Sequence, residues 1–458
     1  MAKSGTPFTL GVASGEPLPD GVVLWTRLAP DPLNAKRPGG MPDRTVSVRW
    51  QLAEDRGFAR VVQSGTAAAR PDWAHSVHVR VAGLRPGTEY FYRFSVDGHV
   101  SPVGRTKTAP APDSADTVRF CFASCQRYEH GHFTALRHLA DELPDVVLHL
   151  GDYIYEYGKP KQPRPGRYVR PLESEAECTT LAAYRRRYAR YHMDPDLQAA
   201  HAAAPWITLP DDHEVRDNWA GTLPGNGGSP SAFLNRRAAA FRAYYEHLPL
   251  RVRPTGPDLR NFRLRPYGRA VDFMIVDARQ HRSGPDMLGR EQEEWLISKM
   301  KTSTARWKVL AQAVFFARRR FPNGASSADA WDGFPDSRAR VLAEAPDGLV
   351  VLSGDVHNNW ACDLRADWAD PESAALGVEF VGTSVTSMPP DTDAKAILEL
   401  NPHIGFFDGH RGYVSCTASM DDFSADYRVV DYVDRRGAPV STVAAFRVEK
   451  NRLRRIDL

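Results

Sequence analysis

The sequence has few cysteines, no long apolar run and no dense block of basic residues. Only five of its 458 residues are cysteine, an odd number without the spacing of a zinc module. No apolar run is long enough to span a bilayer, so we expect no membrane span. The net charge of +3 is close to neutral for this length, which argues against a nucleic-acid partner. No Gly-x-Gly-x-x-Gly follows an apolar strand, which excludes a dinucleotide-binding fold.

The first residues lack the basic and apolar segments of a signal peptide. The chain is therefore cytosolic as written, or it is a mature form whose targeting segment has been removed. The arginine runs at 185–187 and 318–320 predict solvated surface. Cys121 lies on a core-facing pattern and is expected to pack as a small apolar residue. Cys125 follows the same strand and is the cysteine expected to bind a ligand.

The composition and patterning predict two domains of different class. Hydrophobic residues make up 42% and charged residues 25% of the chain, as in an ordinary globular protein. Residues 1–115 show short alternating runs, which predict a small all-β sandwich. A turn before Tyr90 resembles the fibronectin-III pattern in which a tyrosine hydroxyl holds the corner of the sandwich. A stretch rich in proline and small residues at 108–116 predicts a linker. Residues 116–458 alternate strands with helices and predict an α/β domain.

Within the second region, helical spacing of apolar residues predicts helices at 133–143, 174–204, 231–247 and 289–301. Strands are expected at 271–277 and 307–314, and strands and turns at 421–458. The glycine-rich segment 221–231 is expected to be a loop near an acidic block. It could flex over a site or be an ordinary surface loop.

Four apolar strands in this region end in side chains that can bind a metal. The strands lie at 118–122, 146–150, 206–209 and 350–353, and two of them lead into Gly-Asp. Because open α/β sheets place ligands beyond the carboxyl ends of their strands, we expect these side chains to converge. A capping or packing role for all of them would require four separate coincidences. The donors are Cys125, Asp152, Tyr155, Asp212, His213, Asp355 and His357.

These blocks resemble the PhoD-type alkaline phosphatase and phospholipase D family of the calcineurin-like metallophosphoesterase superfamily. The resemblance rests on residues 124–126, 151–156, 211–214 and 354–357. It extends over nearly the whole chain, with further blocks at 13–17, 22–27, 379–384, 401–404 and 411–414. It implies a double-sheet α/β/β/α sandwich over 116–458, preceded by the small all-β domain at 1–115.

The resemblance implies an Fe³⁺ site held by Cys125, Asp152, Tyr155 and His357, with Asp152 bridging to a second metal. Ferric iron prefers anionic donors, which the thiolate, carboxylate and phenolate supply. The other donors are mostly carboxylate and amide oxygens, which favour Ca²⁺ or Mg²⁺ over Zn²⁺. Mg²⁺, Mn²⁺ or Zn²⁺ are the alternatives to the Fe³⁺–Ca²⁺ pair. The oxygen donors are Asp212, Asp355 and either Asp217 or Asn218.

One departure concerns the second metal. The family pattern has two asparagines before a tryptophan, whereas this chain has Asp217 and Asn218 before Trp219. An aspartate in place of the first asparagine would add a negative charge at the second metal and could change its affinity or preference.

Two adjacent cations would lower the pKa of a water and clamp the phosphoryl oxygens for in-line attack. His213 resembles the superfamily histidine that protonates or stabilises the leaving oxygen, and its alternative role is structural. A guanidinium matches two phosphate oxygens, and Arg127, Arg216 and Arg279 lie near strand ends. Three other residues could border the site or serve only packing and capping: Tyr153, Asn358 and His403.

The resulting hypothesis is an exported, secreted or periplasmic enzyme that hydrolyses phosphate monoesters and has phosphodiesterase activity. The alternative within the same family is a phospholipase D-like phosphodiesterase that acts on phospholipid head groups. A non-enzyme alternative is a degenerate phosphate-binding protein, against which the intact donor set argues. The expected partner is a small-molecule phosphate ester or a phospholipid.

Overall fold

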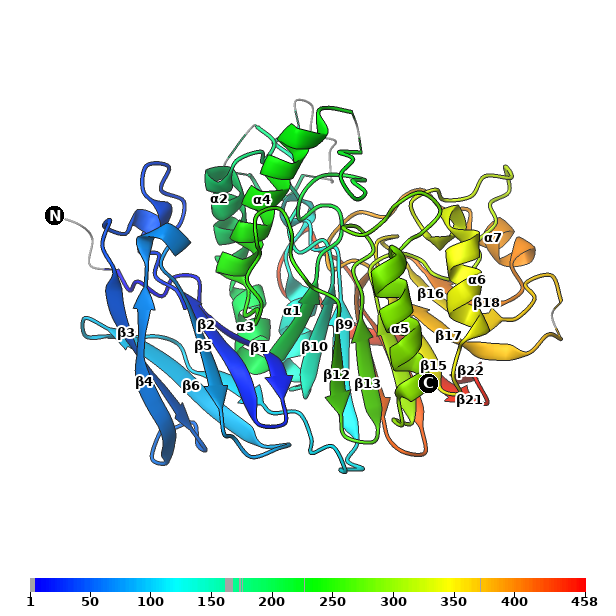
Figure 1. The fold of residues 1–458 in the computed structure, drawn as a ribbon, viewed down its shortest axis with the longest axis horizontal. Coiled ribbons are helices and arrows are strands. Elements are labelled where there is room, and N and C mark those ends of the chain that lie inside the picture. Colours follow the sequence, from blue (N-terminus) through cyan, green and yellow to red (C-terminus); the bar gives the residue numbers. More distant parts are fainter. Residues whose placement is uncertain (1–4, 161–167, 173, 175, 226, 371) are drawn as a thin grey trace.

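A computed structural model describes residues 5–160, 168–172, 174, 176–225, 227–370 and 372–458 of the chain. The described part contains two large mixed sheets with helices and a smaller sheet near the N-terminus (Figure 1). The predicted α/β class is therefore confirmed. Within these ranges, no helix is both long and apolar enough to cross a membrane.

The larger sheet has ten strands, and its centre is parallel. β9, β10 and β11 pair in parallel, so their carboxyl ends reach the same edge. The C-terminal strands β20, β21 and β22 extend one side, which confirms the strands expected at 421–458. In spatial order the strands are β22 (Arg452–Ile456), β21 (Val440–Glu449), β20 (Phe423–Val430), β19 (Arg411–Ala418), β9 (Val118–Ala123), β10 (Val146–Leu150), β11 (Pro205–Leu209), β1 (Val12–Leu18), β2 (Gly21–Arg27) and β5 (Ser76–Ala82).

The second sheet has seven strands, of which β13, β14, β15 and β17 are parallel. β13 and β14 fall where the sequence predicts strands at 271–277 and 307–314. In spatial order the strands are β12 (Arg263–Tyr267), β13 (Val271–Ile275), β14 (Trp307–Ala311), β15 (Leu349–Ser353), β17 (Ala375–Val381), β16 (Asn359–Arg365) and β18 (Ile404–Asp408).

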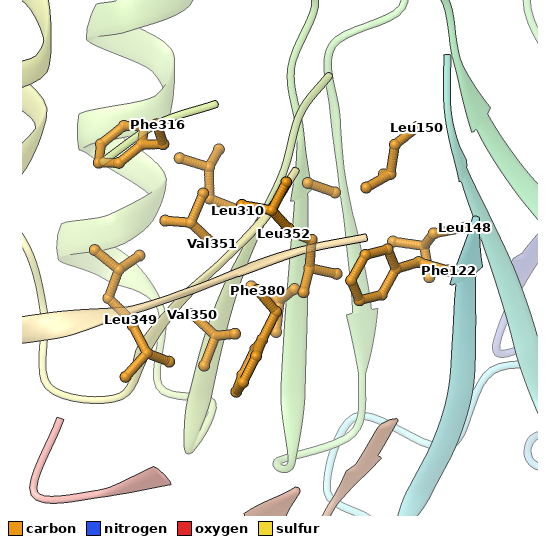
Figure 2. Close-up of a cluster of buried hydrophobic side chains, with 14 of the residues drawn as sticks. Phe122, Leu148, Leu150, Leu310, Phe316, Leu349, Val350, Val351, Leu352 and Phe380 are labelled. Carbon is orange, nitrogen blue, oxygen red and sulfur yellow. The ribbon is translucent and has the colours of Figure 1, made fainter. Parts of the chain in front are cut away.

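The two large sheets pack face to face around the main apolar core. Phe122 and Leu148 from the ten-stranded sheet share this core with Leu352 and Phe380 from the seven-stranded sheet (Figure 2). Val147, next to Leu148 in β10, instead packs with the cluster formed by helices α1 to α4. This alternation is the two-residue period of a strand covered on both faces.

Helices cover the outer faces of both sheets. α1 to α4 pack on the ten-stranded sheet, while α5 and α6 pack on the seven-stranded sheet. The segment expected to be helical at 174–204 contains two helices, because Asp194 caps a new helix whose first residue is Pro195. The helices are α1 (Thr134–Asp141), α2 (Leu181–His192), α3 (Pro195–Ala203), α4 (Pro230–His247), α5 (Arg290–Thr302), α6 (Pro335–Ala343) and α7 (Ala394–Leu400). Short 3₁₀ turns are η1 (Pro38–Gly40), η2 (Pro71–Trp73), η3 (Tyr128–His130) and η4 (Trp331–Gly333).

The N-terminal region is built of strands, as predicted. A five-stranded sheet packs against β2 and β5 through Leu24, Val48 and Tyr92. The Arg85 N–H donates to the Tyr90 hydroxyl at 3.1 Å, so Tyr90 holds the corner as the sequence predicts. The strands of this sheet are β4 (Val61–Ala69), β3 (Val46–Ala53), β6 (Glu89–Val96), β7 (His99–Val100) and β8 (Gly104–Lys107).

This N-terminal sandwich shares a sheet with the rest of the molecule. β1 pairs in parallel with β11, with Ser14 opposite Pro205 and Gly15 opposite Trp206. Gly15 is required at this junction, because a Cβ there would lie 2.6 Å from the Trp206 carbonyl oxygen. The sequence could not show this pairing, since β1 and β11 are about 190 residues apart. The domain boundary near residue 115 stays a prediction.

Candidate metal centre

The ends of β9 and β10 are joined by backbone hydrogen bonds. The Cys125 N–H donates to the Gly151 carbonyl, and the Gln126 N–H donates to the Asp152 carbonyl, both at 3.1 Å. Across the two sheets, a parallel bridge joins Ser124 to Ser384, which follows β17. Because β15 and β17 pair in parallel, this bridge also places the loop after β15, which carries Asp355 and His357, at the same edge.

Four of the predicted donors form one cluster. A ligand atom from each of Cys125, Asp152 and His357 lies within 4.8 Å of the others. The Tyr155 hydroxyl donates to Asp152 Oδ2 at 2.7 Å and lies 3.1 Å from His357 Nε2. His357 Nδ1 lies 3.0 Å from the Met388 carbonyl, which accepts only from an N–H and therefore leaves Nε2 free to face the cluster.

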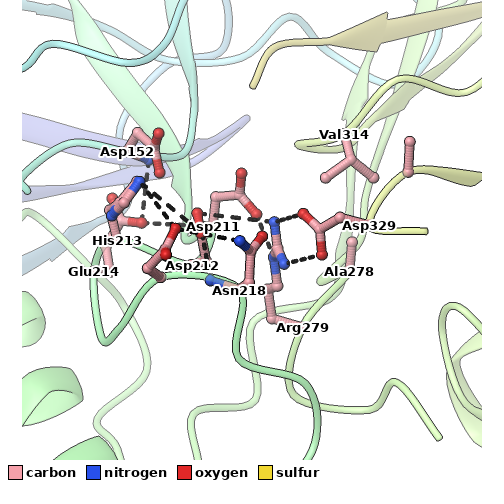
Figure 3. A network of polar contacts seen from close by, with 12 residues as sticks. Asp152, Asp211, Asp212, His213, Glu214, Asn218, Ala278, Arg279, Val314 and Asp329 are labelled. Carbon is pink, nitrogen blue, oxygen red and sulfur yellow. Dashed lines mark hydrogen bonds and ion pairs between the residues drawn. The ribbon is translucent and has the colours of Figure 1, made fainter. Parts of the chain in front are cut away.

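A second cluster shares Asp152 with the first. Ligand atoms of Asp152, Asp212 and His213 lie within 4.8 Å of one another. Figure 3 shows Asp152 above His213 and Asp212, with Arg279 on the far side of Asp212. Asp152 is therefore the one side chain common to both clusters, which is the position of the bridging carboxylate that the family resemblance implies.

The acidic side chains fit cations, because several buried oxygens have no other partner. Asp152 Oδ1, Asp211 Oδ2 and Asp212 Oδ1 are buried without a hydrogen-bond partner among the described residues. Unpaired carboxylate oxygens of this kind are costly unless a cation or a donor satisfies them. Burial raises the pKa of the Asp152 carboxyl well above its ordinary value, as does the nearby Asp212, although His213 opposes the rise. A cation would reverse this shift.

The backbone is strained at the same places. Five of the nine predicted site residues have a positive φ, between 54° and 64°. Asparagine and aspartate tolerate this conformation, but cysteine and histidine do so at a cost of about 1–3 kcal/mol each. Such strain clusters at functional sites because the loops aim side chains at one point. The five residues are Cys125, Asp152, Asn218, Asp355 and His357.

Gly151 allows the two acidic loops to approach. Its φ is 98°, and a Cβ at this position would lie 2.4 Å from the Cβ of Asp211. Any other residue would therefore push the β10 loop away from the β11 loop.

Glu214 holds the loop after β10 and the loop after β11 together. Its carboxylate accepts backbone N–H groups of Asp152 at 3.1 Å, Tyr153 at 2.5 Å and Asp211 at 2.7 Å. Burial raises the pKa of this fully buried carboxyl to about 8. Nothing in the sequence indicates this role of Glu214 except its place in the acidic block.

Another buried carboxylate, Glu156, orients the His213 ring. Its Oε2 lies 2.8 Å from His213 Nδ1, and its Oε1 accepts the Asp217 N–H at 2.7 Å. Burial lowers the pKa of His213, but the carboxylates of Asp212 and Glu156 outweigh it and raise the pKa well above its ordinary value. A bound cation would oppose that rise because it neutralises Asp212. Glu156 is the second residue whose role the sequence analysis missed.

The remaining predicted oxygen donors lie around these clusters. The Asn218 N–H donates to Asp212 Oδ2 at 2.7 Å, and Asp217 Oδ1 lies 4.0 Å from His213 Nε2. Gly225, in the glycine-rich loop, approaches the carbonyls of both Asp217 and Asn218. Asp355 belongs to neither cluster of described ligand atoms, although its pKa is raised by burial and by the nearby Asp211.

Of the three arginines considered as phosphate ligands, Arg279 already binds two aspartates. Its Nε donates to Asp211 at 2.6 Å, and its two Nη atoms donate to Asp329 at 2.7 and 2.8 Å (Figure 3). Arg216 donates to the Gly227 carbonyl at 2.9 Å. Neither lines the cavity beside the clusters, and the choice of the phosphate-binding arginine stays a prediction.

Arg127 does line that cavity, which has a volume of about 650 Å³ and also includes Asp355 and His357 in its wall. Its guanidinium pairs with Glu129 at 2.5 Å and lies over the Tyr155 ring, 5.3 Å from the centroid. Arg127 is therefore the one of the three that faces space for a ligand.

Three other residues were expected either to border the site or to pack. Asn358 lines the cavity next to His357. Tyr153 points away, with its hydroxyl 3.0 Å from His192 Nε2 and 2.7 Å from His201 Nε2. His403 Nε2 lies 2.7 Å from the Arg318 carbonyl, and the ring meets Trp368 edge to face, so it has a packing role.

The fold is shared with a known phosphatase. The structure of purple acid phosphatase PPD1 from yellow lupin (Lupinus luteus) seeds matches with a TM-score of 0.56, over 92% of this chain and 71% of that one. At 14% identity this likeness concerns the fold alone. The fold and the two donor clusters together define an α/β protein with a phosphatase-like fold and a candidate metal centre.

The sequence comparisons identify the family within this class. Residues 120–427 match the PhoD-like phosphatase family, and residues 1–110 match the PhoD-like phosphatase N-terminal domain. The chain is 48% identical to alkaline phosphatase D of Bacillus subtilis (strain 168), over 98% of this chain and 82% of that protein. The structure of PhoD matches with a TM-score of 0.96 and 47% identity, over 100% of this chain and 93% of that one. The chain belongs to the PhoD-like phosphatase family.

Proposed function

We propose that the chain is a metal-dependent alkaline phosphatase that hydrolyses phosphate monoesters and also phosphodiesters. The observation that supports this most directly is Asp152, which belongs to both donor clusters and keeps one buried oxygen without a partner. A carboxylate in this position suits two adjacent cations. Two such cations supply a water of lowered pKa and charge stabilisation for the phosphoryl group.

The donor types support different metals in the two clusters. Cys125, Asp152, Tyr155 and His357 would hold Fe³⁺, while Asp152, Asp212 and Asn218 or Asp217 would hold Ca²⁺, or Mg²⁺, Mn²⁺ or Zn²⁺ in its place. Burial, together with the Asp152 charge, raises the pKa of the Cys125 thiol and of the Tyr155 hydroxyl well above their ordinary values. Both groups therefore stay protonated at neutral pH unless a cation displaces their protons.

The chain's own residues would bind and protonate the substrate. His213 is held by Glu156 with Nε2 directed toward Asp212 and Asp217, 4.0 Å from each. From there its protonated ring would give a proton to the leaving oxygen. Arg127, on the cavity wall, would hold a phosphoryl oxygen.

Elemental analysis of the purified protein, with a visible absorption spectrum, tests the metal assignment. We expect iron and calcium in comparable amounts and a charge-transfer band that weakens in Cys125→Ala and in Tyr155→Phe. Cys121→Ala is the matched control, because Cys121 is equally buried but packs with the helices. Asp152→Asn should lose both metals. Two zinc ions without colour would overturn the metal identities.

Turnover of p-nitrophenyl phosphate, bis-p-nitrophenyl phosphate and phosphatidylcholine tests the substrate class. Hydrolysis of the first two is expected, and release of choline from the third would favour the phospholipase alternative. If no ester is hydrolysed after iron and calcium are supplied, the proposal of an enzyme is overturned and a phosphate-binding protein is favoured. The family resemblance also predicts export, which fractionation of expressing cells tests.

A further inference from the structure

The arginine run at 318–320, predicted to be solvated surface, lines the cavity beside the metal centre. Arg319 is only 8% exposed, and it lines the cavity of about 650 Å³ whose wall also includes Asp355 and His357. The run follows β14, and none of the three arginines belongs to a helix or strand. The prediction of a solvated run is therefore wrong for Arg319, because the loop turns this side chain inward.

The Arg319 guanidinium rests on a support of aromatic rings. It lies 4.3 Å from the ring centroid of Phe315, 4.9 Å from that of Phe321 and 5.8 Å from that of Trp360. Cation–π contacts of this kind hold the plane of a guanidinium in place without using its N–H groups. The side chain is therefore positioned, yet its donors remain available.

No anion within the described residues neutralises this guanidinium directly. Arg319 Nε is buried without a hydrogen-bond partner, and the side chain makes no ion pair in the described part of the chain. By contrast, the buried Arg279 and Arg338 each pair with an aspartate at 2.6–2.7 Å. A buried and unpaired cation is costly, so the site is incomplete without an anionic ligand.

The described carboxylates near Arg319 form no ion pair with it. Asp332 accepts the Arg319 N–H at 2.8 Å and pairs with Arg338 at 2.7 Å. Asp355 has no such partner and is the carboxylate whose charge acts most strongly on Arg319, although no ion pair joins them. As a predicted metal ligand, it would be neutralised by a bound cation. On the cavity wall, Asp393 caps α7 by accepting the Ala396 N–H at 3.1 Å, and Asp391 is exposed.

The positive charge continues away from the metal centre. A second cavity of about 570 Å³ shares Arg319 and Phe321 with the first, and Arg318 and Arg320 also line it. Among the described residues the side chains of Arg318 and Arg320 make no hydrogen bond or ion pair. Arg319 and Phe321 therefore line both cavities, with predicted metal ligands in the wall of the first and further arginines in the wall of the second.

We propose that Arg319 forms a second anion subsite beside the metal centre, and that the enzyme favours phosphate esters whose alcohol carries a second phosphate group. This inference rests on the proposed function, because the metal centre must hold the phosphate that is cleaved. The planar fork of Arg319 matches two oxygens of the second phosphate. The apolar wall formed by Phe321, Met388 and Ile397 contacts the carbon chain between the two phosphates.

Binding of two stable phosphonates to the metal-loaded protein tests the subsite. Isothermal titration with propylphosphonate and with propane-1,3-bisphosphonate compares one anionic group with two on the same chain. We expect the wild type to bind the bisphosphonate about tenfold or more tightly, the value of one charge-assisted hydrogen-bond pair. Arg319→Met should abolish this gain and leave the affinity for propylphosphonate unchanged, because methionine keeps the packing on the aromatic rings.

Arg56→Gln is the charge-matched control, since Arg56 is exposed in the turn between β3 and β4. It should keep the full gain. Equal binding of both phosphonates by the wild type, or equal weakening of both by Arg319→Met, would overturn the subsite. If Arg319→Met does not fold, Arg319→Lys is measured instead, because lysine keeps the positive charge but not the planar fork. An undiminished preference of Arg319→Lys for the bisphosphonate would contradict the proposal.

Hydrolysis of p-nitrophenyl phosphate distinguishes failure of the proposed subsite from failure of the proposed function. Turnover of this monoester without a preference for the bisphosphonate overturns the subsite alone. No turnover and no binding of either phosphonate overturn the proposed function, and the subsite with it.

Discussion

Oε2 of Glu156 lies 2.8 Å from Nδ1 of His213, and this contact links the loop after β10 to the loop after β11. The other oxygen of Glu156 accepts the Asp217 N–H at 2.7 Å, so the carboxylate has both oxygens engaged. His213 therefore has one orientation, in which Nε2 faces the acidic cluster. A carboxylate behind a histidine both orients the ring and stabilises its protonated form.

Glu156→Gln should move the alkaline limb of the pH–rate profile to lower pH. The carboxylates of Asp212 and Glu156 raise the pKa of His213, so losing one charge lowers that pKa. If the protonated ring is the acid, activity falls as pH rises through its pKa, and this fall begins earlier in the variant. The measurement is kcat against pH with p-nitrophenyl phosphate. Glu177→Gln, at an exposed carboxylate, should leave the profile unchanged. An unshifted limb in Glu156→Gln would remove His213 from the proton transfer.

Arg279→Met should destabilise the fold. The guanidinium is fully buried and pairs with Asp211 and Asp329. Its removal leaves the buried Asp211 without its partner, while the part-exposed Asp329 keeps its ion pair with Arg282. Breaking a buried pair in this way costs about 3–5 kcal/mol. Urea unfolding of the metal-free protein measures this loss without a contribution from metal binding. The control is Arg290→Gln, whose ion pair with Glu294 is exposed, and its unfolding midpoint should not move. A loss below about 1 kcal/mol would mean that the pair is no stronger than a surface contact.

Glu16 should contribute to stability at neutral pH and lose that contribution in acid. Burial alone would raise its pKa, but Arg263 and Arg265 outweigh burial and lower the pKa from 4.5 to about 2. Because the folded-state pKa is the lower one, the stabilisation is complete above pH 4.5 and disappears as pH falls toward 2. A shift of this size corresponds to about 3 kcal/mol.

Glu16→Gln tests this directly, by urea unfolding at pH 7 and at pH 3. The variant should be less stable than the wild type at pH 7, and the difference should shrink at pH 3. Glu89→Gln, which removes a half-exposed partner of Arg105, should show a much smaller difference at both pH values. A gap between wild type and Glu16→Gln that stays constant with pH would contradict the shifted pKa.

His149→Phe should stabilise the protein, most strongly in acid. Both ring nitrogens of His149 are buried without a partner, and the ring packs on Trp206 and Tyr153. Burial lowers its pKa from 6.5 to about 3, so below pH 6.5 the unfolded chain binds a proton that the folded chain does not. Wild-type stability therefore falls as pH drops, and phenylalanine removes this dependence at similar size.

Thermal unfolding at pH 5 and pH 8 measures the effect. The gain should be about 1–3 kcal/mol at pH 8, from the unpartnered polar groups that are removed, and larger at pH 5. His410→Phe is the control, because His410 is exposed and its stability effect should be small at both pH values. A destabilised His149→Phe would mean that the ring nitrogens have a partner, such as buried water.

The strands that carry the donors could be predicted because their signals are local. An apolar run that ends in Gly151 and Asp152 requires a turn at the glycine, and the carboxyl ends of parallel strands meet at one edge. The same reasoning predicted that Cys125 and His357 lie at that edge. The helices at 133–143, 231–247 and 289–301 follow from apolar spacing alone, within a few residues at their ends.

The partners of those donors could not be predicted, because they come from distant parts of the chain. Glu214 reaches the Asp152 N–H across 62 residues, and Arg279 reaches Asp211 across 68. Residue type gives no sign of which buried carboxylate holds a loop and which one faces a cation. Arg279 resembled a phosphate ligand by its position in the sequence, yet its three donating nitrogens are all occupied by aspartates.

The sequence by itself determined the class of each segment and the residues that gather at the strand ends, since periodicity and the Gly-Asp turns act over a few residues. Tertiary structure alone decided two further features: β1 joins the large sheet, and Arg319 turns into the cavity. Each depends on which surfaces pack together, and packing is set by the summed burial of residues far apart in the chain. A run of three arginines therefore looks the same in sequence whether its middle side chain meets water or a phosphate.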